Sequence, residues 1–249
     1  MPRTILVAVI ALFVGALSAQ RASSADMSPV TAASGPALSW TGVYIGGHFG
    51  GAWSSYDWYI PLTATNIAGG CPGCPRSAGG HSASSYLAGL QIGVDYQMGA
   101  LVAGVEADFS WTSFRPATVS LASAALTNNS RTDWFGTVAA RLGIAWNRTL
   151  VYGKAGGAWA RDRFFTSDTT TGAELQSVKV WPWGWMVGLG GEYAVNGGLS
   201  IKAEYNYLDF GNRRRTLSPV CGGCLAFDYD IRQTMHVAKI GLNYRLGGL

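Results

Sequence analysis

Charged residues are scarce in this sequence. Asp, Glu, Lys and Arg make up 13% of the 249 residues, whereas a soluble globular domain carries about 25%. The net charge of +4 is mild and no long basic tail is present, so nothing indicates a nucleic-acid partner. Glycine is abundant, with 34 copies. This composition suits a protein whose outside faces lipid and whose crowded inside accepts small residues.

Long apolar runs are also missing. One continuous run occurs, from Ile5 to Leu17, and it is too short for a membrane-spanning helix, which needs about 20 residues. Arg3 precedes this run and small residues up to Ala25 follow it, as in a signal peptide. We therefore expect a signal peptide over residues 1–25, cleaved after Ala25, and a periplasmic lead over residues 26–39. A single domain then remains, over residues 40–249.

Alternating polarity dominates that domain. In residues 236–246, apolar Ile240 and Leu242 alternate with Lys239, Gly241 and Asn243. Successive side chains of a strand point to opposite faces, so this segment has one apolar and one polar face. Similar segments occupy residues 41–53, 86–98, 101–111, 134–146, 150–161, 183–193 and 199–207. Such segments of about 10 residues, separated by turns, are typical of membrane barrels. We predict an all-β, eight-stranded antiparallel up-and-down transmembrane β-barrel.

The connections between these segments alternate in length. Those over residues 54–83, 113–131, 162–180 and 211–231 are long. The others, around Gly99, Asn147 and Asn196, are short. Long extracellular loops alternating with short periplasmic turns are the bacterial outer-membrane pattern. We therefore expect both chain ends in the periplasm and the protein in the Gram-negative outer membrane.

Aromatic residues should gather where a barrel meets the two membrane surfaces. The predicted strand directions place one group near the outer surface: Trp53, Tyr86, Trp111, Trp134, Trp159, Trp183 and Tyr207. A second group falls near the inner surface: Tyr96, Trp146, Tyr193 and Tyr244. A soluble sandwich has no reason to produce two such girdles, so the aromatic residues favour a membrane barrel.

Two motifs resemble a known family. Ser39–Gly50 (SWTGVYIGGHFG) and Lys239–Leu246 (KIGLNYRL) are similar to the first and last strands of porin-family outer-membrane β-barrel proteins, the small OmpA-like barrels also described as outer-membrane immunogenic proteins. The resemblance covers about residues 40–246 and implies an eight-stranded barrel. Members usually end on an aromatic residue that the barrel assembly machinery recognises. Here the chain continues to Leu249, so recognition either rests on Tyr244 and Leu246 or is less efficient.

Charged residues occur on the inward parity of the strands in equal numbers of each sign: Asp95, Glu106, Asp108, Glu192 and Glu204 against Arg141, Lys154, Lys202, Lys239 and Arg245. The interior of an eight-stranded barrel is only just wide enough for its side chains, and buried charges have to be paired. We expect a salt-bridged plug. The alternative is a narrow path for ions or small solutes.

Four cysteines form two pairs, Cys71 with Cys74 and Cys221 with Cys224. The periplasm is oxidising, so we expect disulfides, either within each pair or across the two loops. A four-thiolate zinc site and redox catalysis are the alternatives. Haem binding and a lipid-modifying enzyme would each draw on the three histidines, but no partner at a fixed spacing supports either, so we expect no cofactor and no catalysis.

Arg213, Arg214 and Arg215 fall in the last long loop, where guanidinium groups could bridge lipopolysaccharide phosphates. The alternative is an ordinary solvated loop. The sequence as a whole predicts an outer-membrane barrel that stabilises the envelope and contacts lipid, lipopolysaccharide and extracellular partners through its loops. A small pore is the second hypothesis and an enzyme the third.

Overall fold

The computed structural model describes residues 38–69, 74–196, 198–220, 222–223 and 225–246. The predicted signal peptide and most of the predicted lead lie outside these residues. Residues Leu38–Leu249 make up one compact unit, and most of its described residues are in strands. Within the described residues, no helix is both long enough and apolar enough to cross a membrane.

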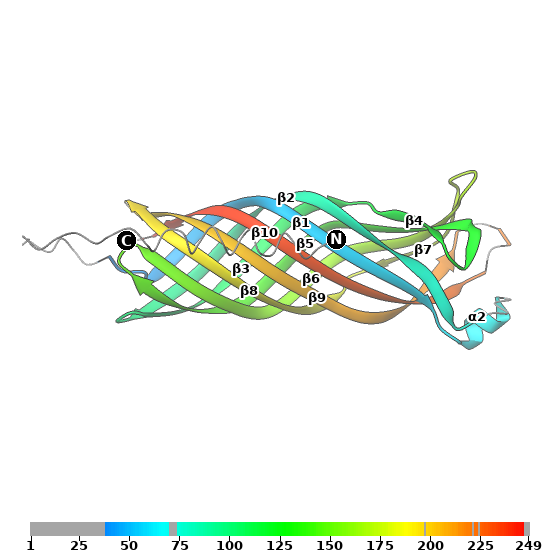
Figure 1. Ribbon diagram of the computed structural model, residues 1–249, viewed down its shortest axis with the longest axis horizontal. Coiled ribbons are helices and arrows are strands. Elements are labelled where there is room, and N and C mark those ends of the chain that lie inside the picture. Colours follow the sequence, from blue (N-terminus) through cyan, green and yellow to red (C-terminus); the bar gives the residue numbers. More distant parts are fainter. Residues whose placement is uncertain (1–37, 70–73, 197, 221, 224, 247–249) are drawn as a thin grey trace, which may run out of the picture. The chain divides into compact units, whose positions relative to one another are not determined.

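Eight long strands form a closed ring (Figure 1). They are β1 (Gly42–Ile60), β2 (Arg76–Met98), β3 (Leu101–Phe114), β5 (Ser123–Trp146), β6 (Thr149–Asp168), β8 (Trp183–Asn196), β9 (Leu199–Pro219) and β10 (Phe227–Arg245). Each pairs antiparallel with its neighbours in chain order. The ring closes where β1 pairs with β10, from Tyr44 opposite Arg245 to Tyr59 opposite Asp230. The predicted fold class is confirmed.

The strands reach much further than predicted. β1 continues to Ile60 and β2 begins at Arg76, so strand replaces much of the predicted loop over residues 54–83. The other predicted loops shrink in the same way, and two of them also hold the short strands β4 (Ala117–Ser120) and β7 (Glu174–Val180). A short helix, α2 (Ala64–Ala68), follows β1. Figure 1 shows α2, β4 and β7 at the same end of the barrel. The prediction ended each strand where its outward apolar residues ended, but backbone pairing continues above that point.

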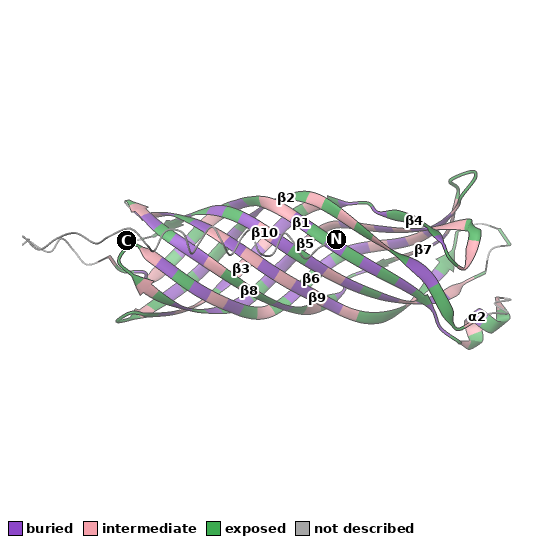
Figure 2. Ribbon diagram, viewed as in Figure 1, coloured by how far each residue is buried: buried purple, intermediate pink, exposed green. Residues whose placement is uncertain are grey.

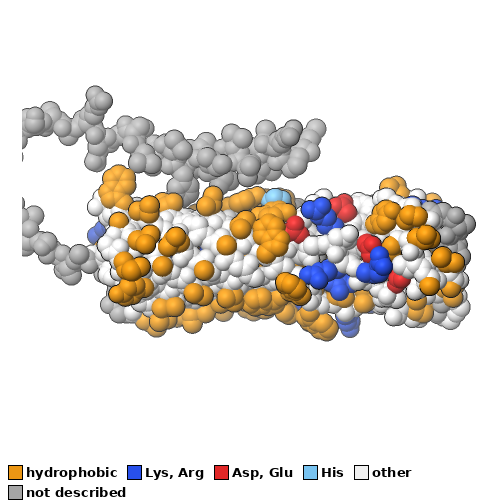
Figure 3. Space-filling model, turned by 90° about the horizontal axis from the view of Figure 1, so that it is seen from below, with side chains coloured by type: hydrophobic (Ala, Val, Ile, Leu, Met, Phe, Trp, Pro, Cys, Tyr) orange, Lys and Arg blue, Asp and Glu red, His pale blue; other side chains and the backbone are white. Residues whose placement is uncertain are grey.

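The alternation of burial follows the predicted faces (Figure 2). Leu90, Ile92, Leu189 and Ile240 point outward and are 53–71% exposed. On the face seen in Figure 3, hydrophobic side chains cover one half of the barrel, and charged side chains gather in a band beyond them. The short turns at the other end need left-handed backbone conformations, which Gly99 (φ 62°) and Asn147 (φ 53°) supply.

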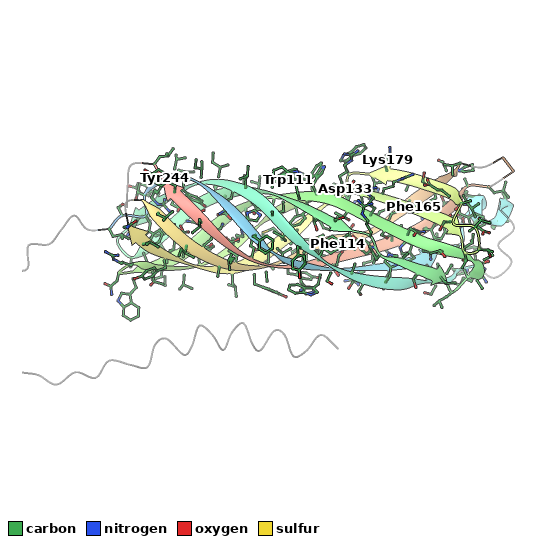
Figure 4. The ribbon with its side chains drawn as sticks, turned by 90° about the horizontal axis from the view of Figure 1, so that it is seen from above. Trp111, Phe114, Asp133, Phe165, Lys179 and Tyr244 are labelled. Carbon is green, nitrogen blue, oxygen red and sulfur yellow. The ribbon has the colours of Figure 1, made fainter. Side chains whose placement is uncertain are left out.

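The aromatic residues form the two predicted levels. Trp111 pairs with Trp134 and Trp159 with Trp183, so the upper level passes from strand to strand. Trp111 lies about midway along the barrel and Tyr244 near one end (Figure 4). Because the strands extend beyond the upper level, part of the barrel wall stands outside the predicted membrane span on the extracellular side.

Candidate functional site: a charge network sealed inside the barrel

The ten inward charged residues predicted from the sequence all lie buried in one layer of the barrel. Arg141 on β5 donates from Nε to Asp95 Oδ1 at 2.7 Å and from Nη1 to Glu192 Oε2 at 3.3 Å. Its guanidinium also lies 4.7 Å from the ring centroids of Tyr44 and Tyr152, which flank it. This arginine therefore joins two carboxylates and two aromatic rings across the lumen.

The three lysines join the remaining carboxylates. Lys154 Nζ lies 2.8 Å from Glu106 Oε1 and 3.0 Å from Glu204 Oε2. Lys202 Nζ lies 2.7 Å from Glu106 Oε2 and 3.0 Å from Glu204 Oε1. Lys239 Nζ lies 3.2 Å from Asp108 Oδ2 and 3.3 Å from Glu204 Oε2. Lys154 Nζ also lies 3.6 Å from Asp108 Oδ2. Each lysine thus contacts at least two carboxylates, which offset the cost of removing its ammonium group from water.

Arg245 completes the network near the periplasmic end. Its Nη2 donates to Asp95 Oδ2 at 2.9 Å, and its Nη1 donates to the carbonyl oxygens of Trp40 and Gly42. Its guanidinium also lies 5.5 Å from the Trp40 ring. The last strand is thereby tied to the residues that lead into the first one.

Uncharged inward residues that the sequence analysis did not include extend this network. The Tyr44 hydroxyl donates to Glu106 Oε2 at 2.9 Å, and the Tyr152 hydroxyl donates to Glu204 Oε1 at 2.6 Å. His48 Nδ1 lies 2.6 Å from Gln91 Oε1 and its Nε2 lies 2.8 Å from Ser110 Oγ. These residues could have been predicted from the sequence, because they have the same inward parity as the charged residues.

Apolar layers lie on both sides of the charged layer. On the periplasmic side, Trp40, Val102, Leu150, Tyr152 and Ala194 pack together. On the extracellular side, a second cluster is contributed by every strand of the ring: Ala52, Leu87, Phe114, Phe135, Ala139, Ala158, Ala160, Met186, Leu208, Phe210, Met235 and Val237. A third cluster, including Tyr56, Trp58, Phe164 and Tyr229, fills the extracellular end.

A buried polar group lies between the two extracellular apolar clusters. Asp162 on β6 is 1% exposed and accepts a hydrogen bond from Thr132, whose hydroxyl also lies 2.8 Å from the Tyr56 hydroxyl. The Gln233 side chain also interacts with this carboxyl. Burial raises the pKa of Asp162 from 3.8 to about 7. Residue 162 was expected in a loop, so this carboxyl was not among the predicted inward charges.

The three adjacent arginines lie in β9, not in the predicted loop. Arg214 points outward and forms two hydrogen bonds with Asp230, at 2.8 and 3.1 Å. The guanidinium of Arg213 lies 4.9 Å from the Trp183 ring centroid. Arg215 is partly buried, and its burial and the nearby Arg213 lower its pKa. The three residues therefore have different environments. The prediction had treated them alike, as three arginines of one loop.

The histidines lie apart from one another. His48 is in the lumen. His81 is at the extracellular end, where its Nε2 lies 2.8 Å from Ser130 Oγ. His236 faces outward. His236 Nδ1 lies 2.6 Å from the Tyr205 hydroxyl, at the upper aromatic level. Within the described part of the chain, no group of three or more metal-ligating side chains is present.

The predicted disulfides stay a prediction. Cys71, Cys221 and Cys224 lie outside the described residues, and Cys74 packs against the extracellular apolar cluster. The cysteines follow β1 and β9 in the sequence, and both of these strands run toward the extracellular end of the barrel.

Comparisons with known proteins agree with this architecture. A family model described as the outer membrane protein beta-barrel domain matches residues 9–246. The 31 kDa outer-membrane immunogenic protein of Brucella melitensis biotype 1 is 32% identical over 260 residues, which cover 98% of this chain and 100% of that protein. The 22 kDa outer membrane protein of Rhizobium leguminosarum bv. viciae is 27% identical over 197 residues, covering 78% of this chain and 74% of that one.

Among solved structures, the outer membrane protease OmpT from Escherichia coli superposes with a TM-score of 0.55 at 8% identity, covering 82% of this chain and 97% of that one. At this identity the likeness shows the fold alone. The family match and the Brucella relative go further, because each spans nearly the whole chain. This chain belongs to the outer membrane β-barrel family and is a protein of the cell outer membrane.

Proposed function

We propose that this protein is a closed outer-membrane barrel that stabilises the envelope and contacts lipopolysaccharide and other surface partners through its extracellular end. The observation that carries the proposal is the order of layers in the lumen. A layer of paired charges is held between an apolar cluster around Trp40 and the apolar cluster that includes Phe135 and Met235. A water-filled path would have to pass through both apolar clusters.

The pairing of the charges supports the same function. All ten ionised side chains contact a partner of opposite sign. A selective pore needs charged groups that face water and exchange ions, whereas these groups are fully desolvated and bound to each other. A rigid plug of this kind resists deformation of the barrel, which is useful in a structural protein.

The extracellular end supports the surface role. The strands extend past the upper aromatic level and carry outward charged residues such as Arg131, Arg163 and Arg214. The Brucella relatives are named outer-membrane immunogenic proteins, which agrees with an end that is accessible from outside. No catalytic step is part of this proposal, since His236 contacts Tyr205 rather than a carboxylate.

A deletion strain tests this proposal against the pore hypothesis. Loss of the protein should make cells more sensitive to detergents and to large antibiotics, while uptake of small solutes stays unchanged. Complementation with the wild-type chain should restore the barrier. Slower uptake of small solutes in a strain with an intact barrier would contradict the proposal and support a pore.

A further inference from the structure

One stretch of the barrel wall is incompletely paired. On the side of β9 that faces β7 and β8, pairing with β8 ends at Asp209 opposite Trp185. Pairing with β7 is limited to Ser218 and Pro219, opposite Ser177 and Gln176. Among these described residues, the part of β9 between Asp209 and Ser218 has no strand partner on that side. The wall is therefore open there, just above the upper aromatic level.

A recess occupies this opening. It is lined by Phe164, Pro182, Phe210, Gly211, Arg213, Arg215, Ile231 and Gln233. Arg213 and Arg215 are two residues apart on one strand, so both point to the same face with their Cα atoms about 7 Å apart. The pairing register puts Arg213 opposite Ile231 and Arg215 opposite Tyr229, whereas Arg214 lies opposite Asp230 on the outer face.

The two arginines of the recess lack a bound carboxylate. Among the described residues, neither forms an ion pair within 4 Å, although Arg214 between them pairs with Asp230. Asp162 is the acidic group that attracts Arg215, and burial favours its neutral form. Two guanidinium groups that repel each other and have little compensation are a ready binding site for an anion.

The buried polar groups on the inner side of the recess interact with each other. Gln233 lines the recess and is 3% exposed, and its side chain interacts with the Asp162 carboxyl and the Tyr56 hydroxyl. The donors available to an anion in the recess are therefore those of the two arginines.

The surroundings of the recess indicate where the anion comes from. Arg213 stacks over Trp183, and Trp181, Trp183 and Trp185 are 65%, 68% and 51% exposed. Exposed tryptophans of this kind mark the level of lipid headgroups. We propose that Arg213 and Arg215 form a specific site for one phosphate of a lipid headgroup, namely a lipid A phosphate of the outer leaflet. This inference rests on the lipopolysaccharide contact of the proposed function and assigns it to named residues.

Binding of lipid A to the full chain in detergent tests this site. The probes are bisphosphorylated lipid A, dephosphorylated lipid A and inorganic phosphate, and the readout is native mass spectrometry. The test variant is Arg213→Gln with Arg215→Gln, and the matched control is Arg214→Gln. Folding of each variant is checked by the shift in electrophoretic mobility on heating, which intact membrane barrels show.

The wild-type chain should bind bisphosphorylated lipid A and should show no binding of the dephosphorylated form. The double variant should lose at least about 10-fold in affinity, because charge-assisted hydrogen bonds to phosphate are lost. Arg214→Gln should stay within about twofold, since that arginine is already paired with Asp230.

Four results would overturn the site. An equal loss in Arg214→Gln would mean that net charge alone is responsible. Inorganic phosphate binding as tightly as lipid A would remove the headgroup assignment. Unchanged lipid A binding in the double variant would place the contact elsewhere, while leaving the lipopolysaccharide contact of the proposed function standing. Failure of the wild-type chain to bind lipid A would instead remove that contact from the proposed function, and the site with it.

Discussion

Lys154 Nζ lies 2.8 Å from Glu106 Oε1, although the two residues are on strands that do not pair with each other. Lys154 is on β6 and Glu106 on β3, and β5 stands between them in the ring. The ion pair therefore crosses the lumen instead of running along its wall. Glu106 also binds Lys202 and lies 3.7 Å from Arg141 Nη1, so removing this one carboxylate affects three buried cations.

Replacing Glu106 by Gln should destabilise the barrel strongly. The substitution leaves Lys154 and Lys202 with one buried carboxylate fewer between them, and such a loss costs about 3–5 kcal/mol. The measurement is the free energy of unfolding in urea, from lipid vesicles, followed by tryptophan fluorescence. Glu174→Gln is the control because Arg163 and Glu174 form a partly exposed pair, worth no more than about 1 kcal/mol. Equal effects of the two substitutions would contradict a desolvated network.

Gly93→Ala tests how tightly the lumen is filled. A Cβ at this position would collide with the hydroxyl of Tyr44, which is held by Glu106. We expect a loss of about 1–3 kcal/mol in the free energy of unfolding, the usual cost of overpacking. Gly157→Ala is the matched control, since a Cβ there meets no heavy atom within 4 Å. A Gly93 variant as stable as the Gly157 variant would mean that Tyr44 has room to move.

Leu90→Arg tests the placement of the membrane span. Leu90 is 60% exposed on the outside of β2, among other apolar residues. An arginine on the lipid face should cost about 2–4 kcal/mol. Val119→Arg, on the short strand β4 at the extracellular end, should change the free energy of unfolding by less than about 0.5 kcal/mol. If the two arginines cost the same in vesicles, the apolar band is not where the lipid lies.

Asp162 should make the stability depend on pH. Its pKa is 3.8 in the unfolded chain and about 7 in the folded one, so the folded state holds the proton more tightly. Stability conferred by this group is complete below about pH 4 and is lost as the pH rises to about 7, a total of about 4 kcal/mol. Asp162→Asn should remove this decline. The measurement is the free energy of unfolding in urea between pH 4 and pH 8. If it varies with pH in the same way in the wild-type chain and in Asp162→Asn, the raised pKa of Asp162 is wrong.

The sequence was informative inside the membrane and misleading above it. Between the aromatic levels, outward residues such as Leu90 and inward residues such as Lys154 follow a strict period of two, because one face meets lipid and the other meets a crowded lumen. Above the outer level the outward residues become polar, as at Arg131 and Asp133. The outward pattern therefore resembles a loop while the backbone is still paired.

The partners of buried groups could not be predicted from the alternation. The sequence places Glu106 and Lys202 on the inward face, but they are 96 residues apart and meet only because of the barrel's register and stagger. The barrel's register also explains why Arg214 has an ion-pair partner while Arg213 and Arg215 have none among the described residues. Its partner Asp230 is fixed by the β9–β10 register, and that register shifts at a bulge between Gln233 and Thr234.

Single-channel conductance of the refolded protein in a planar bilayer tests the closed lumen most directly. The recording should be made with the cysteines oxidised and then reduced, so that the extracellular segments are tested in both states. Protein shown to be folded and inserted should give no steady current steps in either state, because two apolar clusters close the charged layer. Reproducible steps from the wild-type chain would contradict the closed lumen and make the inward charges the lining of a pore.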